Sequence, residues 1–257
     1  MIRPARDRLG GSARSLARRA LAAVARRAER PELIATFYSG ARQLLHEEIA
    51  IKAVLGAVLR RDATYVDVGT NRGQLLAAAL AAAPEGRHVA FEPIPQLAAE
   101  LRRSFPQVDS RQLALSAEPG TAQFCHFRTM DGWSGLRRSP EISDERGTPE
   151  YIEVSLSTLD IELAELEPRV IKIDVEGAEL QVIQGGRSLL AATKPFVIFE
   201  HAAAAAALYG SPSVALFHSL EELGYEIFAI TGDGPYTPAD FAASTGVVNW
   251  FARPRRS

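Results

Sequence analysis

The chain has 257 residues, of which 47% are hydrophobic and 23% charged, and its formal net charge is −2. These are the values of an ordinary soluble globular protein, long enough to bury a substantial core in one large or two small domains. The single cysteine, Cys125, excludes an intramolecular disulfide and a cysteine-based zinc site, and no apolar run reaches the roughly 20 residues that a transmembrane helix needs.

The first 30 residues are strongly basic. They hold nine arginines against Asp7 and Glu29, a net charge of +7, which leaves −9 for the rest of the chain. Because their apolar residues are few and diluted by alanine, we expect a solvated or loosely docked helix, within a helical N-terminal extension over 1–60. Weak contact with anionic lipid, or a transit peptide, is the alternative. No continuous apolar stretch follows the arginines, so we expect no secretory signal and a cytoplasmic protein.

A helix is predicted at roughly 40–60, where apolar residues recur at helix-compatible spacing. From Thr64 onward, strands and helices alternate. The predicted strands are TYVDV (64–68), RHVAFEP (87–93) and DSRQLALS (109–116), and the predicted helices span 72–83 and 95–104. Such alternation predicts a parallel sheet with right-handed crossovers, and therefore an α/β domain over 61–257 with helices on both faces of the sheet.

The middle of the chain has a different pattern. Residues 121–127 and 151–159 alternate like the antiparallel strands of an inserted β-hairpin, and the polar stretch 128–150 lies between them. A loop of that length is usually functional or disordered, so we expect it to build a substrate pocket together with the loop 231–245. The parallel theme then resumes, with strands at 170–174, 195–201, 225–230 and 246–254 and helices at 177–190 and 212–223.

The first strand ends in the turn VDVGTNRG (66–73), which leads into a helix. This turn lacks the G-x-G-x-x-G pattern of dinucleotide-binding proteins, having only Gly69 and Gly73, and Asp67 would repel a pyrophosphate. A ligand with a positive centre and an amino group fits better, as adenosylmethionine does. Gly69 allows the backbone to approach such a ligand closely, and main-chain groups around Thr70–Arg72 can bind its amino-acid end.

The second strand ends at Glu92, 19 positions after Gly73. An acidic side chain about 20 residues beyond such a turn grips adjacent ribose hydroxyls. It does not distinguish NAD from adenosylmethionine. In this order and spacing, the turn and the acidic residue together predict nucleoside binding rather than a purely structural role.

The segment IKIDVEGAELQVIQGG (171–186) places Asp174, Glu176 and Glu179 where an apolar strand ends. A strand covered by helices on both faces is normally apolar throughout, whereas open α/β sheets bind ligands beyond the carboxyl ends of their strands. We therefore expect the reaction to take place here. The alternative is that Asp174 or Glu176 caps the helix 177–190, and Glu179 is expected to be a solvated or structural helix residue.

The segments VDVGTNRG, FEP, TLD, IKIDVEGAELQVIQGG and FVIFEH together resemble the FkbM family of adenosylmethionine-dependent methyltransferases. The resemblance runs from about Thr64 to His201, and K-I-D-V-E-G-A-E is its specific part. It implies a seven-stranded, mostly parallel Rossmann-like sheet. It also implies methyl transfer to a hydroxyl group of a sugar, a glycan or a polyketide-type natural product.

The resemblance also implies cofactor contacts, position by position. The methionine part of the cofactor would lie against Asp67, Gly69, Asn71 and Gly73. Glu92 would hold the ribose, and Ser116, after the third strand, would contact the adenine.

Methyl transfer from a sulfonium is an in-line displacement, so positioning supplies most of the catalysis. A base within reach of the acceptor hydroxyl contributes about 10²–10⁴-fold. Asp174 is the first candidate for this role, Glu176 the second, and Glu200 or His201 could share it. His201 is equally compatible with a structural role. Lys172 alternates with Ile171 and Ile173, so its side chain leaves the face of the strand that they occupy. We expect it to pair with a carboxylate and to set the pKa of that carboxylate.

Several carboxylates at one strand end could also hold Mg²⁺. Because the sequence offers no convincing second pair of ligands, we expect no metal site. Two other functions stay open: an NAD-dependent oxidoreductase, which the missing G-x-G-x-x-G and Tyr-x-x-x-Lys patterns disfavour, and a non-catalytic nucleoside-binding protein. The abundance of arginine is interpreted as coding bias, so no nucleic-acid partner is predicted.

Some residues of the middle segment allow two interpretations. Trp133 either forms a wall of the acceptor pocket or packs in the core, and His126 lies at the other end of the same stretch. Arg137 and Arg138 are expected to be solvated. Cys125 is expected to be a packed thiol rather than a nucleophile.

Overall fold

A computed structural model describes residues 31–128, 134–138 and 148–255 of the chain, without the side chains of 31–42 and 44. The chain divides into two compact units, Met1–Glu48 and Ile49–Ser257. Helix α2 (Pro31–Val58) begins in the first unit and ends in the second. It confirms the helix predicted at 40–60 and begins earlier. The domain boundary at residue 60 stays a prediction.

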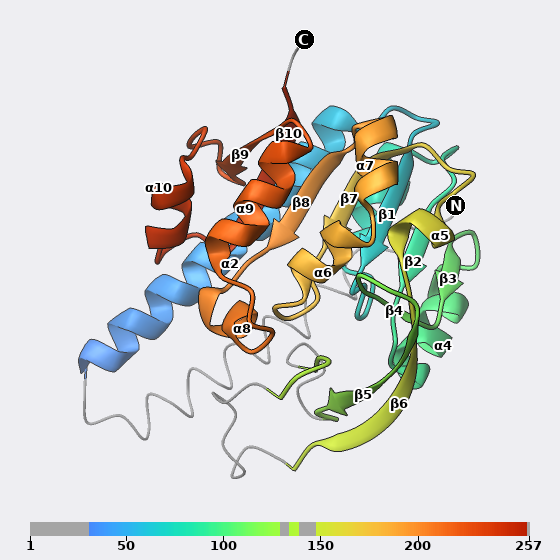
Figure 1. Ribbon diagram of the computed structural model, residues 1–257, viewed down its shortest axis with the longest axis horizontal. Helices are drawn as coiled ribbons and strands as arrows, with labels where there is room; N and C mark the ends of the chain where they lie inside the picture. Colours follow the sequence, from blue (N-terminus) through green and yellow to red (C-terminus); the bar gives the residue numbers. More distant parts are fainter. Residues whose placement is uncertain (1–30, 129–133, 139–147, 256–257) are drawn as a thin grey trace, which may run out of the picture. The chain divides into compact units, whose positions relative to one another are not determined.

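The second unit contains a seven-stranded sheet in the order β3-β2-β1-β7-β8-β10-β9 (Figure 1). All neighbouring strands are parallel except β10, which runs antiparallel to both β8 and β9. The strands are β1 (Thr64–Val68), β2 (Val89–Phe91), β3 (Asp109–Arg111), β7 (Pro168–Ile173), β8 (Phe196–Glu200), β9 (Tyr225–Ala229) and β10 (Asn249–Pro254). This order confirms the predicted α/β fold with its mostly parallel seven-stranded sheet.

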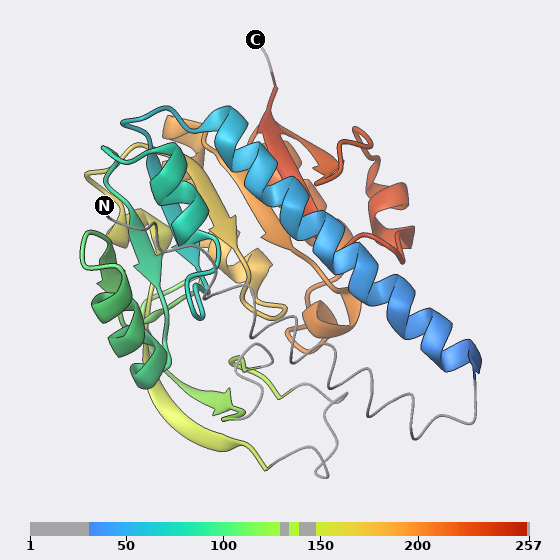
Figure 2. The ribbon, with the colours of Figure 1, turned by 180° about the vertical axis from the view of Figure 1, so that it is seen from behind.

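Helices cover both faces of this sheet. On one face lie α5 (Leu159–Glu162), α6 (Glu179–Gln184), α7 (Arg187–Thr193) and α9 (Ser213–Glu222) (Figure 1). On the other lie α3 (Leu76–Ala82), α4 (Pro95–Ser104) and the last turns of α2 (Figure 2). The side chains of successive strand residues point to opposite faces of the sheet. Val66 therefore packs in the hydrophobic cluster on one face, and Tyr65 packs in a second hydrophobic cluster on the other face. Each buried cluster stabilises one layer of the domain.

A second, three-stranded sheet has the order β4-β6-β5. Strands β5 (Gly120–His126) and β6 (Glu150–Ser157) pair antiparallel and confirm the predicted hairpin. Strand β4 (Ala114–Leu115) pairs parallel to β6. The single strand predicted at 109–116 is therefore wrong: β3 lies at the edge of the large sheet, whereas Ala114 and Leu115 are buried in the small one.

Two predicted helices differ from the structure for reasons that involve glycine. The helix predicted at 72–83 begins only at Leu76, because Asn71 and Gly73 have φ angles of 50° and 74°, which an α-helix cannot accommodate. The helix predicted at 177–190 is two helices, α6 and α7, separated by Gly185 and Gly186. A Cβ on Gly185 would overlap the carbonyl oxygen of Ser116, so the helix changes direction where it meets this neighbouring loop.

The remaining segments are short. Helix α8 (Ala203–Ala207) follows β8, and α10 (Pro238–Ala243) lies within the stretch predicted as the loop 231–245. Of the helices that the structure describes, none combines the length and the apolar character needed to cross a membrane. The predicted membrane contact of residues 1–30 falls outside the described residues, and the cytoplasmic location stays a prediction.

Candidate functional site

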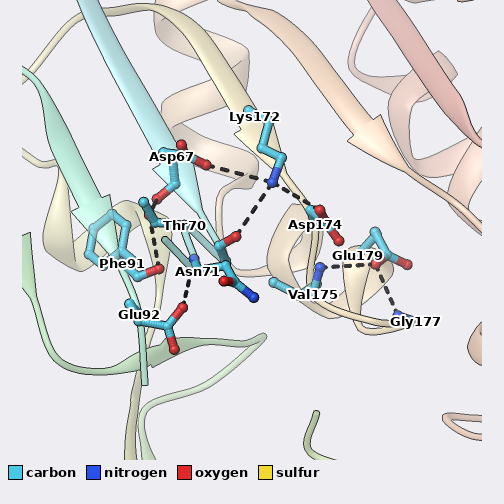
Figure 3. Close-up of polar contacts among 11 residues, drawn as sticks. Asp67, Thr70, Asn71, Phe91, Glu92, Lys172, Asp174, Val175, Gly177 and Glu179 are labelled. Atoms are coloured by element: carbon cyan, nitrogen blue, oxygen red, sulfur yellow. Dashed lines mark hydrogen bonds and ion pairs between the residues drawn. The ribbon is translucent and has the colours of Figure 1, made fainter. Parts of the chain in front are cut away.

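The carboxyl ends of β1, β2 and β7 meet at one edge of the large sheet and bring the predicted charged residues together (Figure 3). Asp67 and Lys172 are register partners on adjacent strands, so their side chains lie on the same face. The Nζ of Lys172 lies 3.0 Å from Oδ2 of Asp174 and 3.7 Å from Oδ1 of Asp67. The expectation from strand parity, that Lys172 pairs with a carboxylate, is confirmed.

Burial governs the charges of this cluster. Asp67 is 2% exposed, and desolvation raises the pKa of its carboxyl, while the ammonium of Lys172 acts in the opposite direction. Burial alone would lower the pKa of Lys172, but the carboxylates of Asp174 and Asp67 outweigh burial and raise it above its ordinary value. Lys172 therefore stays cationic at neutral pH. It also lies 3.4 Å from the carbonyl oxygen of Gly69, to which it donates a hydrogen bond.

The turn after β1 is held against its neighbours by backbone contacts. The amides of Gly69 and Thr70 both donate to the carbonyl of Phe91, and the Thr70 hydroxyl donates to the carbonyl of Asp67 at 2.9 Å. Gly69 has a φ of 77°, and a Cβ there would overlap the carbonyl oxygen of Asp174. The β1 and β7 ends therefore touch through their backbones, which only glycine permits at this position.

Glu92 links the turn after β1 to the start of α4. Its Oε2 accepts the amide of Asn71 at 2.8 Å (Figure 3). Its Oε1 accepts the amide of Ile94 at 2.9 Å. The residue is 4% exposed and lines the cleft described below. Because a carboxylate oxygen can accept more than one hydrogen bond, Glu92 is a candidate acceptor for a ligand in this cleft.

A cleft opens at these strand ends, which we call the acidic cleft. It holds about 650 Å³ of space, including its open mouth. Its polar wall carries Gly69, Asn71, Glu92, Asp174 and Glu176. Its apolar wall includes Val68, Phe91, Ile94, Leu113, Leu115, Phe124 and Leu136. Three carboxyl groups and no basic side chain are among the described lining residues, so the cleft favours a ligand with a positive charge and an apolar, ring-bearing part.

Not every predicted cofactor residue lies in this cleft. Gly73 packs against α4, where a Cβ would lie 2.6 Å from Cε2 of Phe105, so its role there is close packing. The side chain of Thr70 is buried in hydrogen bonds with the protein's own backbone. Ser116 lines a neighbouring groove, whereas residues 113–115 line the cleft. The predicted contact of Ser116 with adenine stays a prediction.

Glu176 and Glu179 follow the end of β7. Glu176 is half-buried with a φ of 55°, and burial, reinforced by the charges of Asp174 and Glu200, raises the pKa of its carboxyl to about 9. Glu179 is 2% exposed, and its Oε1 accepts the amides of Gly177 at 3.0 Å and Val175 at 3.3 Å. Burial raises the pKa of Glu179 to about 7.

These contacts decide between the alternative roles near α6. The helix has no side-chain hydrogen bond at its N-cap, Ala178, so the interpretation of Asp174 or Glu176 as its cap is wrong. Glu179 instead holds the loop before the helix through two backbone amides. Of the two roles expected for Glu179, the structural one is confirmed, and the residue is not solvated.

The pair at the end of β8 contributes less directly. The ring of His201 stacks on Phe241, its centroid 5.1 Å away, and its Nε2 lies 2.8 Å from Oγ of Ser213. Burial lowers the pKa of His201 to about 4, so the ring is neutral at physiological pH. Neither Glu200 nor His201 is among the residues that line the acidic cleft. These contacts favour the structural interpretation of His201, and its catalytic role stays a prediction.

The middle segment supplies a wall that sequence reasoning did not assign to particular residues. Gly135 pairs with Cys125 through two backbone hydrogen bonds, and Ser134 accepts the amide of Phe127. A Cβ on Gly135 would lie 3.3 Å from Cβ of Glu176, so residues 134–138 lie beside the charged cluster. No local pattern announces this bridge, because it joins residues of a polar stretch to a strand. Trp133 falls outside the described residues.

The described residues contain no group of three or more histidine, cysteine or acidic side chains that could hold a metal ion. The chemistry of the donor set agrees, because the ammonium of Lys172 already lies between the carboxylates of Asp67 and Asp174. A divalent cation at that point would face a positive charge within about 3–4 Å. The structure thus gives no support for a Mg²⁺ site there.

Comparisons with known proteins show which family the chain resembles. Residues 67–227 match the family model described as the methyltransferase FkbM domain. The chain is 30% identical over 152 residues to the methyltransferase sdnD of Sordaria araneosa, covering 47% of this chain and 59% of that protein. It is 28% identical over 226 residues to the AMB antimetabolite synthetase AmbE of Pseudomonas aeruginosa, covering 72% of this chain and 11% of that protein.

The chain therefore spans about three fifths of the first relative and about a tenth of the second. Among solved structures, a methyltransferase FkbM from Methylobacillus flagellatus is similar at 13% sequence identity and a TM-score of 0.48. That match covers 76% of this chain and 44% of the other.

Proposed function

Because this chain belongs to the FkbM family of methyltransferases, we propose that it transfers a methyl group from adenosylmethionine to a hydroxyl group. The proposed acceptor is a sugar, a glycan or a polyketide-type natural product. The observation that carries the choice of cofactor is the lining of the acidic cleft, which holds the carboxyl groups of Glu92, Asp174 and Glu176 and no basic side chain among the described lining residues. Lys172 pairs with Asp174, and the raised pKa of Glu176 keeps that carboxyl protonated at neutral pH, so the lining carries fewer than three full negative charges but offers an anion no positive partner.

This charge also separates the proposal from its main rival. The pyrophosphate of NAD would bring two negative charges into a lining that has carboxyl groups and no basic side chain among its described residues, whereas a sulfonium would bring one positive charge. The carboxylate of Glu92 lines the cleft, where it can accept hydrogen bonds from a pair of adjacent hydroxyls such as those of a ribose. When bound, adenosylmethionine would supply a methyl group on a positively charged sulfur.

The chain's own residues then have to orient the acceptor and take its proton. Asp174 lines the cleft and is held by the ammonium of Lys172, so it can accept a hydrogen bond from an acceptor hydroxyl in a fixed orientation. We propose Asp174 as the first candidate for the base and Glu176 as the second. With a pKa of about 9, Glu176 is a stronger base than an ordinary carboxylate once it has lost its own proton.

Calorimetry followed by methyl transfer tests this function. We expect the full chain to bind adenosylmethionine and not NAD. With labelled adenosylmethionine at saturation and a panel of glycosides and hydroxylated macrolides, we expect Asp174→Asn to lower kcat by about 10²–10⁴-fold. Cofactor affinity should fall much less, because Lys172 already pairs with this carboxylate. Glu118→Gln, at an exposed position outside the cleft, serves as the matched control and should leave both values unchanged.

The two steps have separate contrary outcomes. Binding of NAD without binding of adenosylmethionine would remove the proposed cofactor. Undiminished transfer by Asp174→Asn would remove Asp174 from catalysis, and the same measurement on Glu176→Gln would then decide whether the second candidate is the base.

A further inference from the structure

A second groove adjoins the acidic cleft and has the opposite charge. We call it the arginine groove, because Arg137 and Arg138 line it together with Gln123, Tyr151, Gln181 and Tyr209. No acidic side chain is among its described lining residues. Leu136 and Ala178 line both spaces, so the groove and the cleft are adjacent at these two residues.

The arginines are exposed, and Arg137 forms no ion pair with a described residue. A guanidinium presents a planar fork of donors that matches a carboxylate or a phosphate. A single exposed arginine contributes little to binding, but two in one groove can hold an anion through several charge-assisted hydrogen bonds. The arginine groove therefore has the chemistry of an anion site.

The rest of the groove suits a hydroxylated molecule. The Oε1 of Gln181 is buried and has no hydrogen-bond partner among the described residues, while its Nε2 donates to Ser211 at 3.1 Å. An unpaired buried acceptor is costly unless a ligand hydroxyl reaches it. The side chains of Gln123 and Tyr151 add further polar groups at exposed positions.

We infer that the methyl acceptor carries an anionic group, a carboxylate or a phosphate, which Arg137 and Arg138 bind in the arginine groove. The acceptor's reacting hydroxyl then reaches Asp174 and Glu176 across the boundary formed by Leu136 and Ala178. This inference rests on the proposed function and narrows its substrate class. Both arginines are exposed, as the sequence predicted, and the inference adds an anion-binding role because both line a groove adjacent to the site.

The test compares acceptor analogues that differ in one charged group. The full chain, loaded with adenosylhomocysteine, is titrated with p-nitrophenyl β-D-glucuronide and p-nitrophenyl β-D-glucoside, and separately with glucose 6-phosphate and glucose. We expect the anionic member of at least one pair to bind about tenfold more tightly, as charge-assisted hydrogen bonds predict. The first pair tests a carboxylate and the second a phosphate. Added salt should reduce the preference, because the arginines are exposed to solvent.

Variants assign this preference to the arginines. In Arg137→Gln/Arg138→Gln, we expect the anionic and neutral analogues to bind equally, and in Arg137→Lys/Arg138→Lys a part of the preference should remain. Arg103→Gln, which changes an exposed arginine of α4 outside both spaces, is the matched control. Adenosylmethionine affinity should be unchanged in every variant.

Each contrary outcome has its own meaning. If the chain binds adenosylmethionine but no anionic analogue binds more tightly than its neutral partner, this inference fails and the proposed function stands. If the double glutamine variant loses adenosylmethionine, the arginines belong to the cofactor site and the inference is overturned. If the unaltered chain does not bind adenosylmethionine, the proposed function itself fails.

Discussion

At the scale of single residues, the site depends on one backbone crossing. Gly69 follows β1 and touches the carbonyl of Asp174, which follows β7, so the two strand ends meet without a side chain between them. At this point the ammonium of Lys172 donates a hydrogen bond to Asp174, and the amides of Gly69 and Thr70 donate to the carbonyl of Phe91. A side chain at residue 69 would push apart the elements that carry the charged cluster.

Gly69→Ala should therefore destabilise the protein. The φ of 77° costs alanine about 1–2 kcal/mol by itself, and the overlap with backbone atoms adds strain that no rotamer can relieve. We expect the free energy of unfolding to fall by about 3 kcal/mol, measured by urea titration at pH 7. The matched control is Gly120→Ala, where a Cβ would meet nothing within 4 Å. Equal stability of the two variants would contradict the crossing.

Single residues also show how far the sequence could be interpreted. The alternation of Lys172 with its apolar neighbours predicted its pairing with a carboxylate. The order of Asp67, Gly69 and Glu92 predicted that they lie near one another at the carboxyl edge of the sheet. Both predictions were possible because they depend on short stretches of sequence. The position of Ser116, in contrast, depends on a residue far away in the sequence, because its amide donates to the carbonyl of Ser157. Ser116 lines the arginine groove because the strand before it, β4, pairs with β6, whose residues lie more than 40 positions away in the sequence. No short pattern in the chain encodes that pairing.

At the scale of elements, Glu92 joins three of them. It follows β2 directly, accepts the amide of Asn71 in the turn after β1, and accepts the amide of Ile94 at the start of α4. A carboxylate can accept both amides because both of its oxygens are acceptors. The same residue thus sets the shape of the turn and presents acceptors to a ligand.

Glu92→Gln tests both roles of this residue, the support of the turn and the binding of a ligand. Glutamine has one acceptor oxygen, so its amide group would face one of the two backbone N–H groups. We expect the free energy of unfolding to fall by about 1–2 kcal/mol and adenosylmethionine affinity to fall at least about tenfold. Calorimetry and urea titration measure the two quantities.

The control for this prediction is Glu100→Gln on α4, whose carboxylate pairs with Arg72 at an exposed position. Its effect on either quantity should be small, because exposed ion pairs contribute little. Unchanged adenosylmethionine affinity in Glu92→Gln would show that Glu92 supports the turn and takes no part in binding.

Element boundaries were less predictable than element types. Hydrophobic alternation identified β1, β5, β6 and β8, because each strand has a clear period of two or a continuous apolar run. The break between α6 and α7 depends on Gly185 approaching the carbonyl of Ser116, which is a tertiary contact. The late start of α3 likewise depends on the left-handed φ of Asn71 and Gly73, and a helix-like run of alanine conceals it.

At the scale of the whole domain, two spaces of opposite charge lie side by side. The acidic cleft is built by the ends of the parallel strands, and the arginine groove by the small sheet together with residues 134–138. The parallel sheet could be predicted because strands and helices alternate in the sequence. The groove could not, because its residues come from β5, α6, the bridge at Gly135 and the segment after α8.

The buried acids also give the domain a pH-dependent stability. Glu176 and Glu179 have pKa values of about 9 and about 7 in the folded state, above the ordinary value of 4.5, so the folded protein holds protons that the unfolded chain releases. Stability from these groups is present at low pH and is lost as pH rises through 7 and then 9. His201 acts in the opposite direction, but only between about pH 4 and its ordinary 6.5.

The interval from about pH 8 to pH 9 therefore reports mainly on Glu176, since His201 no longer titrates there and Glu179, with a pKa of about 7, has lost most of its proton. We expect the urea midpoint of the unaltered chain to fall across this interval, and Glu176→Gln to remove much of the fall, because glutamine stays neutral at every pH. Glu118→Gln changes an exposed glutamate and should keep the full slope. If Glu176→Gln kept the same slope as the unaltered chain, the proton would reside elsewhere, and Glu176 would enter the reaction already ionised. In that case its strength as a base would be that of an ordinary carboxylate, and the choice between Asp174 and Glu176 would rest on their positions alone.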